Sequence, residues 1–189
     1  ANIAKVKVFE ESVQNNLAAN MVSRWPLNDG SGLIAIDIWG SNNGTLHNSP
    51  TWKSSNECVS NECLCFSGTA YVDCGDLSTR IGKNNITYSL WVKPNTSGHN
   101  TTAVYDFDTF MGKADAGQSG DLSVGYRSDN KVRVYYENLS TGSYIDSINP
   151  IVINEWTHVT VTTNSSSVSL YIDGLLNATG SIATNFVIN

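Results

Sequence analysis

From Gly32 onward, the sequence consists of short runs of β-branched and aromatic residues separated by turns of Gly, Asn, Ser and Asp. Several runs, such as KVRVYYE at 131–137 and WTHVTVTT at 156–163, alternate apolar and polar residues. A period of two is typical of strands with one buried face, and frequent tight turns favour antiparallel pairing. The sequence therefore predicts a mainly β protein, folded as an antiparallel sandwich or barrel.

The individual strands are expected where these runs lie, at 33–38, 64–66, 71–74, 86–92, 103–111, 122–126, 131–137, 156–163 and 167–174. Two polar stretches have the composition of hairpin turns, SDNK at 128–131 and TNSSS at 163–167. No unit recurs at a fixed period, which argues against a solenoid or a propeller.

The first residues follow a different period. Apolar residues recur there in steps of three and four and form one stripe of a helix: Ile3, Val6, Phe9, Val13, Leu17 and Met21. Because Pro26 ends the helix, we expect an N-terminal α-helix over residues 1–24 and a β-sandwich over residues 25–189. The stripe packs either on the domain's own sheet or, in a stalk, on neighbouring subunits.

Composition narrows the classes of function. The net charge is −6, so a nucleic-acid partner is not expected. Charged residues make up only 15% of a chain rich in Asn, Ser and Thr, as is typical of secreted β domains. No run of 18 apolar residues is present, and we expect membrane contact only through a segment outside this chain.

All four cysteines lie in the segment CVSNECLCFSGTAYVDC, residues 58–74. Their spacing lacks the paired C-x2-C or nearby histidines of a zinc site, so two disulfides in an oxidising compartment are expected. Three pairings are possible. We favour Cys58 with Cys63 and Cys65 with Cys74, the second across a hairpin turning at residues 67–70, with Leu64 and Phe66 pointing into the core.

Four segments in order, VSRWPLNDGSG, CLCFSGTAYVDCG, ITYSLWVKP and EWTHVTVTTNSSSVSLYIDGLL, resemble the laminin-G-like, concanavalin A-like lectin/glucanase family. The resemblance covers residues 22 to 188 and implies a jelly-roll β-sandwich. Members usually continue beyond the segment matching IATNFVIN with two further strands. The N-terminal helix is similar to the second half of a type IV pilin or pseudopilin helix, which implies self-association into a filament.

Catalysis is not expected, although enzymes share this fold. Retaining glycosidases need two carboxylates about 5 to 5.5 Å apart, and no glutamate lies in a Glu-x-Asp-x-Glu-like run. Asp106 and Asp108 share one strand face, but they are read as solvent-facing or ion-binding groups. The sequence GQSG at 117–120 is not a nucleophile elbow, because the Gly-x-Ser-x-Gly motif needs one residue between the serine and the second glycine and GQSG has none. His158 occupies a structural strand position in the family and is read as a satisfied sandwich histidine.

A calcium ion is the expected cofactor, if the protein has one. The segment IDIWGSNNGT gathers the oxygen ligands of Asp37, Asn42 and Asn43 in one flexible loop. In related laminin-G-like modules a calcium often lies near this loop, which favours Asp37 as a ligand. Ordinary turn formation by Asn and Gly is the alternative.

Exposed aromatic side chains are the candidates for ligand contact, and Tyr105, Tyr135 and Tyr144 lie on strands that form one face of this fold. We therefore expect a non-enzymatic extracellular protein, at a cell surface or on a pilus, that binds a glycan or a surface protein. Two alternatives stay open: a carbohydrate-binding module of a secreted polysaccharide-degrading enzyme, and a purely structural filament subunit.

Overall fold

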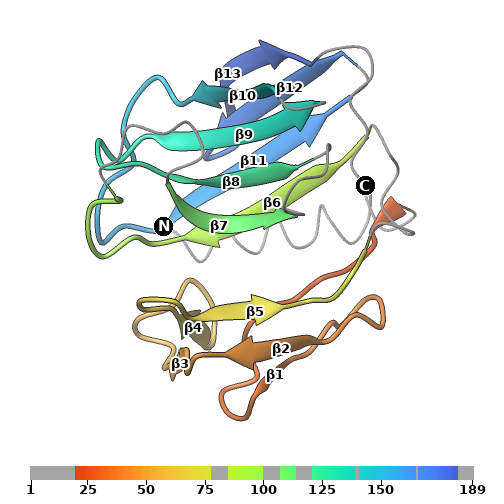
Figure 1. Cartoon of the computed structure of the whole chain (residues 1–189). Helices are drawn as coiled ribbons and strands as arrows, with labels where there is room; N and C mark the ends of the chain where they lie inside the picture. Colours follow the sequence, from red (N-terminus) through yellow and green to blue (C-terminus); the bar gives the residue numbers. More distant parts are fainter. Residues whose placement is uncertain are drawn as a thin grey trace. The chain divides into compact units, whose positions relative to one another are not determined.

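The computed structural model describes residues 20–77, 85–99, 107–113, 121–138, 141–164 and 166–182 (Figure 1). The chain forms two compact units, Ala1–Arg80 and Ile81–Asn189. Each unit is described by itself. Strands dominate the described residues of both, and none of those residues lies in an α-helix. No helix long and apolar enough to cross a membrane occurs in this part of the chain.

The second unit contains two four-stranded antiparallel sheets. One has the strand order β10-β9-β8-β7 and the other the order β13-β12-β11-β6 (Figure 1). The first sheet consists of β7 (Asp108–Lys113), β8 (Leu122–Tyr126), β9 (Val132–Asn138) and β10 (Thr141–Asp146). The second consists of β6 (Thr87–Val92), β11 (Thr157–Thr163), β12 (Ser167–Ile172) and β13 (Leu175–Ser181).

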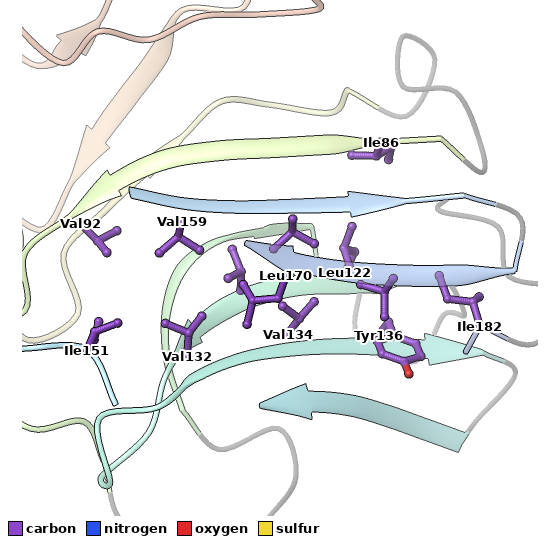
Figure 2. Close-up of a cluster of buried hydrophobic side chains, with 13 residues drawn as sticks. Ile86, Val92, Leu122, Val132, Val134, Tyr136, Ile151, Val159, Leu170 and Ile182 are labelled. Atoms are coloured by element: carbon purple, nitrogen blue, oxygen red, sulfur yellow. The ribbon is translucent and has the colours of Figure 1, made fainter. Parts of the chain in front are cut away.

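The two sheets pack through one apolar core, to which both contribute every second residue. Val132, Val134 and Tyr136 of β9 point to this core, as do Val159 of β11 and Leu170 of β12 (Figure 2). Each fully buried Val or Leu contributes roughly 1.5–3 kcal/mol to the free energy of unfolding. The antiparallel sandwich expected from the alternating pattern is confirmed in this unit.

Both expected hairpin turns are present. In the β8–β9 turn, the Arg127 amide donates to the Lys131 carbonyl over 3.0 Å, and Asn130 has a positive φ of 60°. In the β11–β12 turn, the Asn164 amide donates to the Ser167 carbonyl over 3.0 Å. Asn suits the first position because it tolerates the left-handed conformation, and it suits the second because the Asn164 side chain accepts hydrogen bonds from the amides of Ser166 and Ser167.

The first unit is smaller. It has a sheet of order β1-β2-β5 and a separate pair, β3-β4. Its apolar cluster comprises Ala35, Leu46 and Leu64, against which Trp25 and Leu27 pack. The strands are β1 (Ile34–Ala35), β2 (Gly44–His47), β3 (Thr51–Lys53), β4 (Cys63–Cys65) and β5 (Tyr71–Asp73).

The N-terminal helix expected over residues 1–24 falls largely on residues outside those described. Within the described part, residues 21–24 have no helical structure, so the helix does not extend to the proline. The pilin-like stalk inferred from it therefore has no support in the described structure.

Of the two predicted disulfides, one is present in the structure and the other is not. Cys58 and Cys63 form a disulfide with Cα atoms 5.5 Å apart, whereas Cys65 and Cys74 are free thiols. The 67–70 turn exists, with the Ala70 amide donating to the Ser67 carbonyl. However, β4 pairs with β3 and β5 pairs with β2, so no hairpin joins the two thiols.

Side-chain direction also separates these thiols. Leu64 is buried in the cluster, so Cys65 points to the opposite face of β4. Cys74 shares the face of Val72, and its Sγ lies 3.2 Å from where a Cβ on Gly44 would stand. The expectation for Phe66 was wrong as well, because this residue is 44% exposed.

Candidate functional site

One outward surface of the sandwich gathers aromatic and charged residues. Since Val132, Val134 and Tyr136 of β9 point to the core, Arg133 and Tyr135 point outward. On β10, Ile145 packs against the core, so Tyr144 and Asp146 point outward. Tyr144 lies opposite Tyr135, and Asp146 lies opposite Arg133, in the antiparallel register. We call these four residues, Arg133, Tyr135, Tyr144 and Asp146, the tyrosine face.

An arginine–aspartate network organises the tyrosine face. Arg133 donates from Nε to Asp146 Oδ1 over 2.8 Å and from Nη2 to Asp146 Oδ2 over 2.9 Å. Arg127, in the β8–β9 turn, donates from Nη1 to Asp146 Oδ2 over 2.6 Å. One carboxylate thus accepts three charge-assisted hydrogen bonds from two guanidinium groups, an arrangement that fixes side-chain geometry.

The charges of the network stabilise one another. Burial favours a higher pKa for Asp146, but hydrogen bonds from Arg133 and Arg127 outweigh it and lower the pKa below its usual value. The hydrogen bond to Asp146 raises the pKa of Arg133, and burial opposes it only in part. Both groups are therefore ionised at neutral pH, and the bidentate pair persists there.

Tyr144 is the residue that this network presents to solvent. The Arg133 guanidinium carbon lies 3.7 Å from the centroid of the Tyr144 ring, a cation–π contact. Arg133 is only 5% exposed and Tyr135 only 7%, whereas Tyr144 is 44% exposed. The guanidinium therefore supports one face of the ring, and other parts of Tyr144 remain accessible.

The predicted ligand-binding tyrosines have three different outcomes. Tyr144 and Tyr135 are brought together as cross-strand partners, with the first exposed and the second buried. Tyr105 lies outside the described residues. Sequence reasoning missed Arg133 and Asp146. An arginine between two valines in VRV was a signal for the first, but only the strand register reveals its partner, 13 residues away.

The half of this sheet formed by β7 and β8 differs in side-chain size. Gly112 lies opposite Ser123, and Thr109 lies opposite Gly125. These outward positions continue the two cross-strand rows of Tyr135 and Arg133, respectively. The rows therefore run from small residues on β7 and β8 to large ones on β9 and β10.

The loop predicted to bind calcium is organised by hydrogen bonds within the chain. Asp37 is buried, and its Oδ1 accepts from the backbone amides of Arg24, Trp39 and Gly40 at 2.9–3.0 Å. Its Oδ2 accepts from the Asn42 amide over 3.1 Å. These donors outweigh the effect of burial, which favours a higher pKa, and lower the pKa of Asp37 to about 2.

The same loop brings the three predicted ligands together, because the Asp37 amide donates to Asn43 Oδ1 over 2.9 Å. With its oxygens facing N–H groups, Asp37 fits the turn-forming alternative better than a cation site, since the donors' positive ends repel a metal ion. No cluster of three His, Cys, Asp or Glu side chains suited to a metal occurs among the described residues.

The residues considered for catalysis have structural partners. His158 is 7% exposed, and its Nε2 lies 3.0 Å from Ser89 Oγ. Burial lowers the pKa of His158, although nearby Asp173 acts in the opposite direction, and so favours the neutral ring. This agrees with a structural histidine whose ring is hydrogen-bonded inside the sandwich. Asp108 interacts with His99, with 2.6 Å between Oδ1 and Nδ1, and Asp106 lies outside the described residues.

A family model described as the concanavalin A-like lectin/glucanases superfamily matches residues 66–189. No curated protein matches the chain in sequence. Among solved structures, domain 4 of AbnA, a GH43 extracellular arabinanase from Geobacillus stearothermophilus in complex with arabinotriose, is similar with a TM-score of 0.58. The two chains are 17% identical, and the match covers 81% of this chain and 72% of that one.

Two further structures are similar. An S-layer domain-containing protein (residues 221–444) from Clostridium thermocellum ATCC 27405 has a TM-score of 0.51 at 20% identity, over 88% of this chain and 76% of that one. The binding domain of botulinum neurotoxin DC in complex with SialylT has a TM-score of 0.50 at 18% identity. That match covers 86% of this chain and 42% of the toxin chain. At these identities the likeness is one of fold.

Proposed function

Because this chain belongs to the concanavalin A-like lectin/glucanases superfamily, we propose that it is a non-catalytic, extracellular carbohydrate-binding module that holds a glycan against Tyr144. One observation carries the proposal. Tyr144 is 44% exposed, although a buried guanidinium holds its ring in place from one side. A sugar binds such an aromatic surface through its apolar C–H groups, while neighbouring polar groups orient its hydroxyls.

The immobilised ring favours binding energetically. Association normally costs the freedom of side chains that become ordered, about 0.5–1.5 kcal/mol for each flexible one. Here the contact with Arg133, itself bound twice by Asp146, restrains Tyr144 before any ligand arrives. Preorganisation of this kind suits a binding module.

Three observations support the extracellular, glycan-binding part of the proposal. The Cys58–Cys63 disulfide is typical of oxidising compartments. One similar structure is a domain of an extracellular arabinanase in complex with arabinotriose. Another is a toxin's binding domain in complex with SialylT. The alternative of a module in a secreted polysaccharide-degrading enzyme therefore has more support than a pilus-associated protein.

The similarity to an S-layer domain-containing protein favours a second candidate, display of the same module at a cell surface. Both candidates require a glycan-binding face and differ in what the module is attached to. Immunogold labelling of intact producing cells would distinguish them, since a displayed module stays with the cell and a secreted enzyme's module is found in the medium.

Affinity electrophoresis through gels that contain soluble polysaccharides tests the binding function. We expect at least one polysaccharide to retard the protein, and Tyr144→Ala to weaken that binding about tenfold or more. Tyr171→Ala is the matched control, because Tyr171 is a partly buried tyrosine on β12 of the other sheet. Equal losses in the two variants, with unchanged melting temperatures, would show that the tyrosine face is not the site.

A further inference from the structure

The charges around Tyr144 carry an inference about the kind of glycan. The tyrosine face and the adjoining β8–β9 turn contain two arginines, Arg127 and Arg133, two aspartates, Asp129 and Asp146, and one lysine, Lys131. Asp146 bonds to both arginines, and Arg127 Nε also lies 3.7 Å from Asp129 Oδ1. The arginines and aspartates sum to zero charge, and Lys131 at the end of the turn adds one positive charge, in a chain whose net charge is −6.

Arg133, the guanidinium against the Tyr144 ring, is poorly placed to receive an acidic ligand. Recognition of a carboxylate or sulfate usually uses two parallel N–H groups of one guanidinium. In Arg133, Nε and Nη2 already form such a pair with Asp146, and the side chain is only 6% exposed. A ligand anion would have to displace Asp146 or lie beside it, and like charges in proximity oppose each other.

Asp146 itself favours a hydroxyl donor. A carboxylate has about four lone-pair positions, and the two arginines direct three hydrogen bonds at this one. The remaining position suits the O–H of a sugar and offers nothing to an ionised acidic group, which has no proton to donate. The carboxylate, the exposed ring and the pairing of both arginines with Asp146 thus match one ligand chemistry, an uncharged sugar.

We propose that the tyrosine face selects uncharged glycans over acidic ones, with a sugar ring on Tyr144 and a sugar hydroxyl donating to Asp146. This inference rests on the glycan-binding function proposed above. It concerns the class of ligand and holds for any neutral polysaccharide whose sugar presents an apolar face next to a free hydroxyl.

The test is a matched panel of polysaccharides measured by affinity electrophoresis and calorimetry at 20 mM and 500 mM NaCl. Neutral members are linear arabinan, galactan, xyloglucan and mixed-linkage glucan; acidic members are polygalacturonate, alginate and chondroitin sulfate. We expect neutral binding whose Kd changes less than about twofold with salt, and acidic binding at least about tenfold weaker.

The possible outcomes separate the inference from the function on which it rests. Tight binding of an acidic member, with a Kd that rises steeply with salt, overturns the selection of uncharged glycans and leaves the binding function intact. Failure to bind any member of the panel at millimolar sugar counts against the function itself, and the inference falls with it.

A variant pair tests the role of Asp146. Asp146→Asn should weaken neutral binding about tenfold by removing the charged acceptor, while Glu155→Gln, which removes a negative charge from an exposed loop, should change the Kd less than about twofold. Equal small effects in both variants would contradict the hydroxyl contact. If Asp146→Asn fails to fold, the salt dependence of the native protein still decides between neutral and acidic ligands.

Discussion

Tyr144 shows how a single residue acquires a function from its neighbours. Its ring would be an ordinary surface tyrosine, free to change rotamer, without the guanidinium 3.7 Å from its centroid. That guanidinium is in turn fixed by two hydrogen bonds to Asp146. Binding at Tyr144 therefore depends on residues that need not touch the ligand.

Arg133→Lys tests this dependence. Lysine retains the charge but cannot form the bidentate pair or present a planar group to the ring. We expect glycan affinity to fall about tenfold. Any fall in the melting temperature should be too small to account for this loss through unfolding. Calorimetric titration with the best polysaccharide, beside thermal unfolding, measures both quantities.

Arg127→Lys is the matched control, because Arg127 reaches Asp146 through one nitrogen that a lysine can replace. It should lose distinctly less affinity. An equal loss in the two variants would mean that positive charge, and not the planar stack, supports Tyr144.

Asp37 is the second residue whose role the structure redefines. Its carboxylate joins the chain around Arg24 to the loop around Asn42. Because the folded pKa is depressed to about 2 from 3.8, the ionised group stabilises the fold above pH 4. That stability is lost as the pH falls through the folded pKa.

We therefore expect the free energy of unfolding of the first unit to fall by about 2 kcal/mol between pH 4.5 and pH 2 because of this group. Urea unfolding followed by tryptophan fluorescence at several pH values measures it. In Asp37→Asn, the part of the slope due to this carboxylate should disappear. An unchanged slope would show that other carboxylates cause the acid sensitivity.

Calcium separates the two interpretations of the same loop. With the Asp37 oxygens already accepting amide hydrogens, we expect equal melting temperatures in 5 mM CaCl2 and in EGTA. A clear rise with calcium would support the ion-binding interpretation instead.

At the scale of strands, burial decides which elements the sequence reveals. β8, β9, β11 and β12 have neighbours on both sides in their sheets, alternate clearly, and were predicted almost to the residue. β10 (TGSYID) and β13 (LLNATGS) were missed, and so were the short β2 and β3 of the first unit. β10 and β13 lie at the edges of their sheets, where small and polar residues are tolerated and the alternation is weak.

The tyrosine face could be predicted only in part, because two of its residues lie on the edge strand β10. The tyrosines at 135 and 144 were predicted as exposed aromatic residues on one face of the family's fold, but the partners of Tyr144 were not. Arg133 meets Asp146 only because β10 pairs with β9 in one particular register. A shift of one residue would turn Tyr144 to the other face of the sheet. Sequence alone does not specify the register of a strand whose existence it does not indicate.

The β8–β9 hairpin depends on backbone conformation at Asn130, where φ is 60°. The buried Oδ1 of this side chain has no hydrogen-bond partner within the described structure, so the residue matters mainly for its conformation. Asn130→Gly should keep the free energy of unfolding within about 0.5 kcal/mol.

Asn130→Ala should lower the same quantity by about 1 kcal/mol, because a Cβ disfavours the left-handed region. Chemical denaturation of the two variants compares them directly. Similar losses for glycine and alanine would show that the amide group, not the backbone angle, stabilises the turn.

For the whole molecule, the family match and the compact units divide the chain differently. The match begins at Phe66, within the first unit, and runs through the second. The expectation of one sandwich from residue 25 onward followed from the motifs at both ends of this range. In the structure, the large apolar core belongs to residues of the second unit, and the first unit has a small cluster of its own.

The thiols give a prediction for the intact protein. The unreduced mass should be lower by two hydrogens than the fully reduced mass, because only Cys58 and Cys63 are bonded. Alkylation after denaturation should then label two cysteines. Native alkylation of Cys74 should be slow, because burial, aided by the charges of Asp73 and Asp37, raises its pKa to about 11. A mass lower by four hydrogens would contradict this prediction and would show that Cys65 and Cys74 are also bonded.

The position of β10 at the end of its sheet has a further consequence. Edge strands fray more readily than central ones, and their amide protons exchange faster with deuterated water. Tyr144 and Asp146 both lie on β10, so anything that clamps them also holds this strand against β9. Binding of a glycan at this site should therefore slow deuterium uptake along residues 141–146. Hydrogen exchange can thus detect binding without a label on the protein or the glycan.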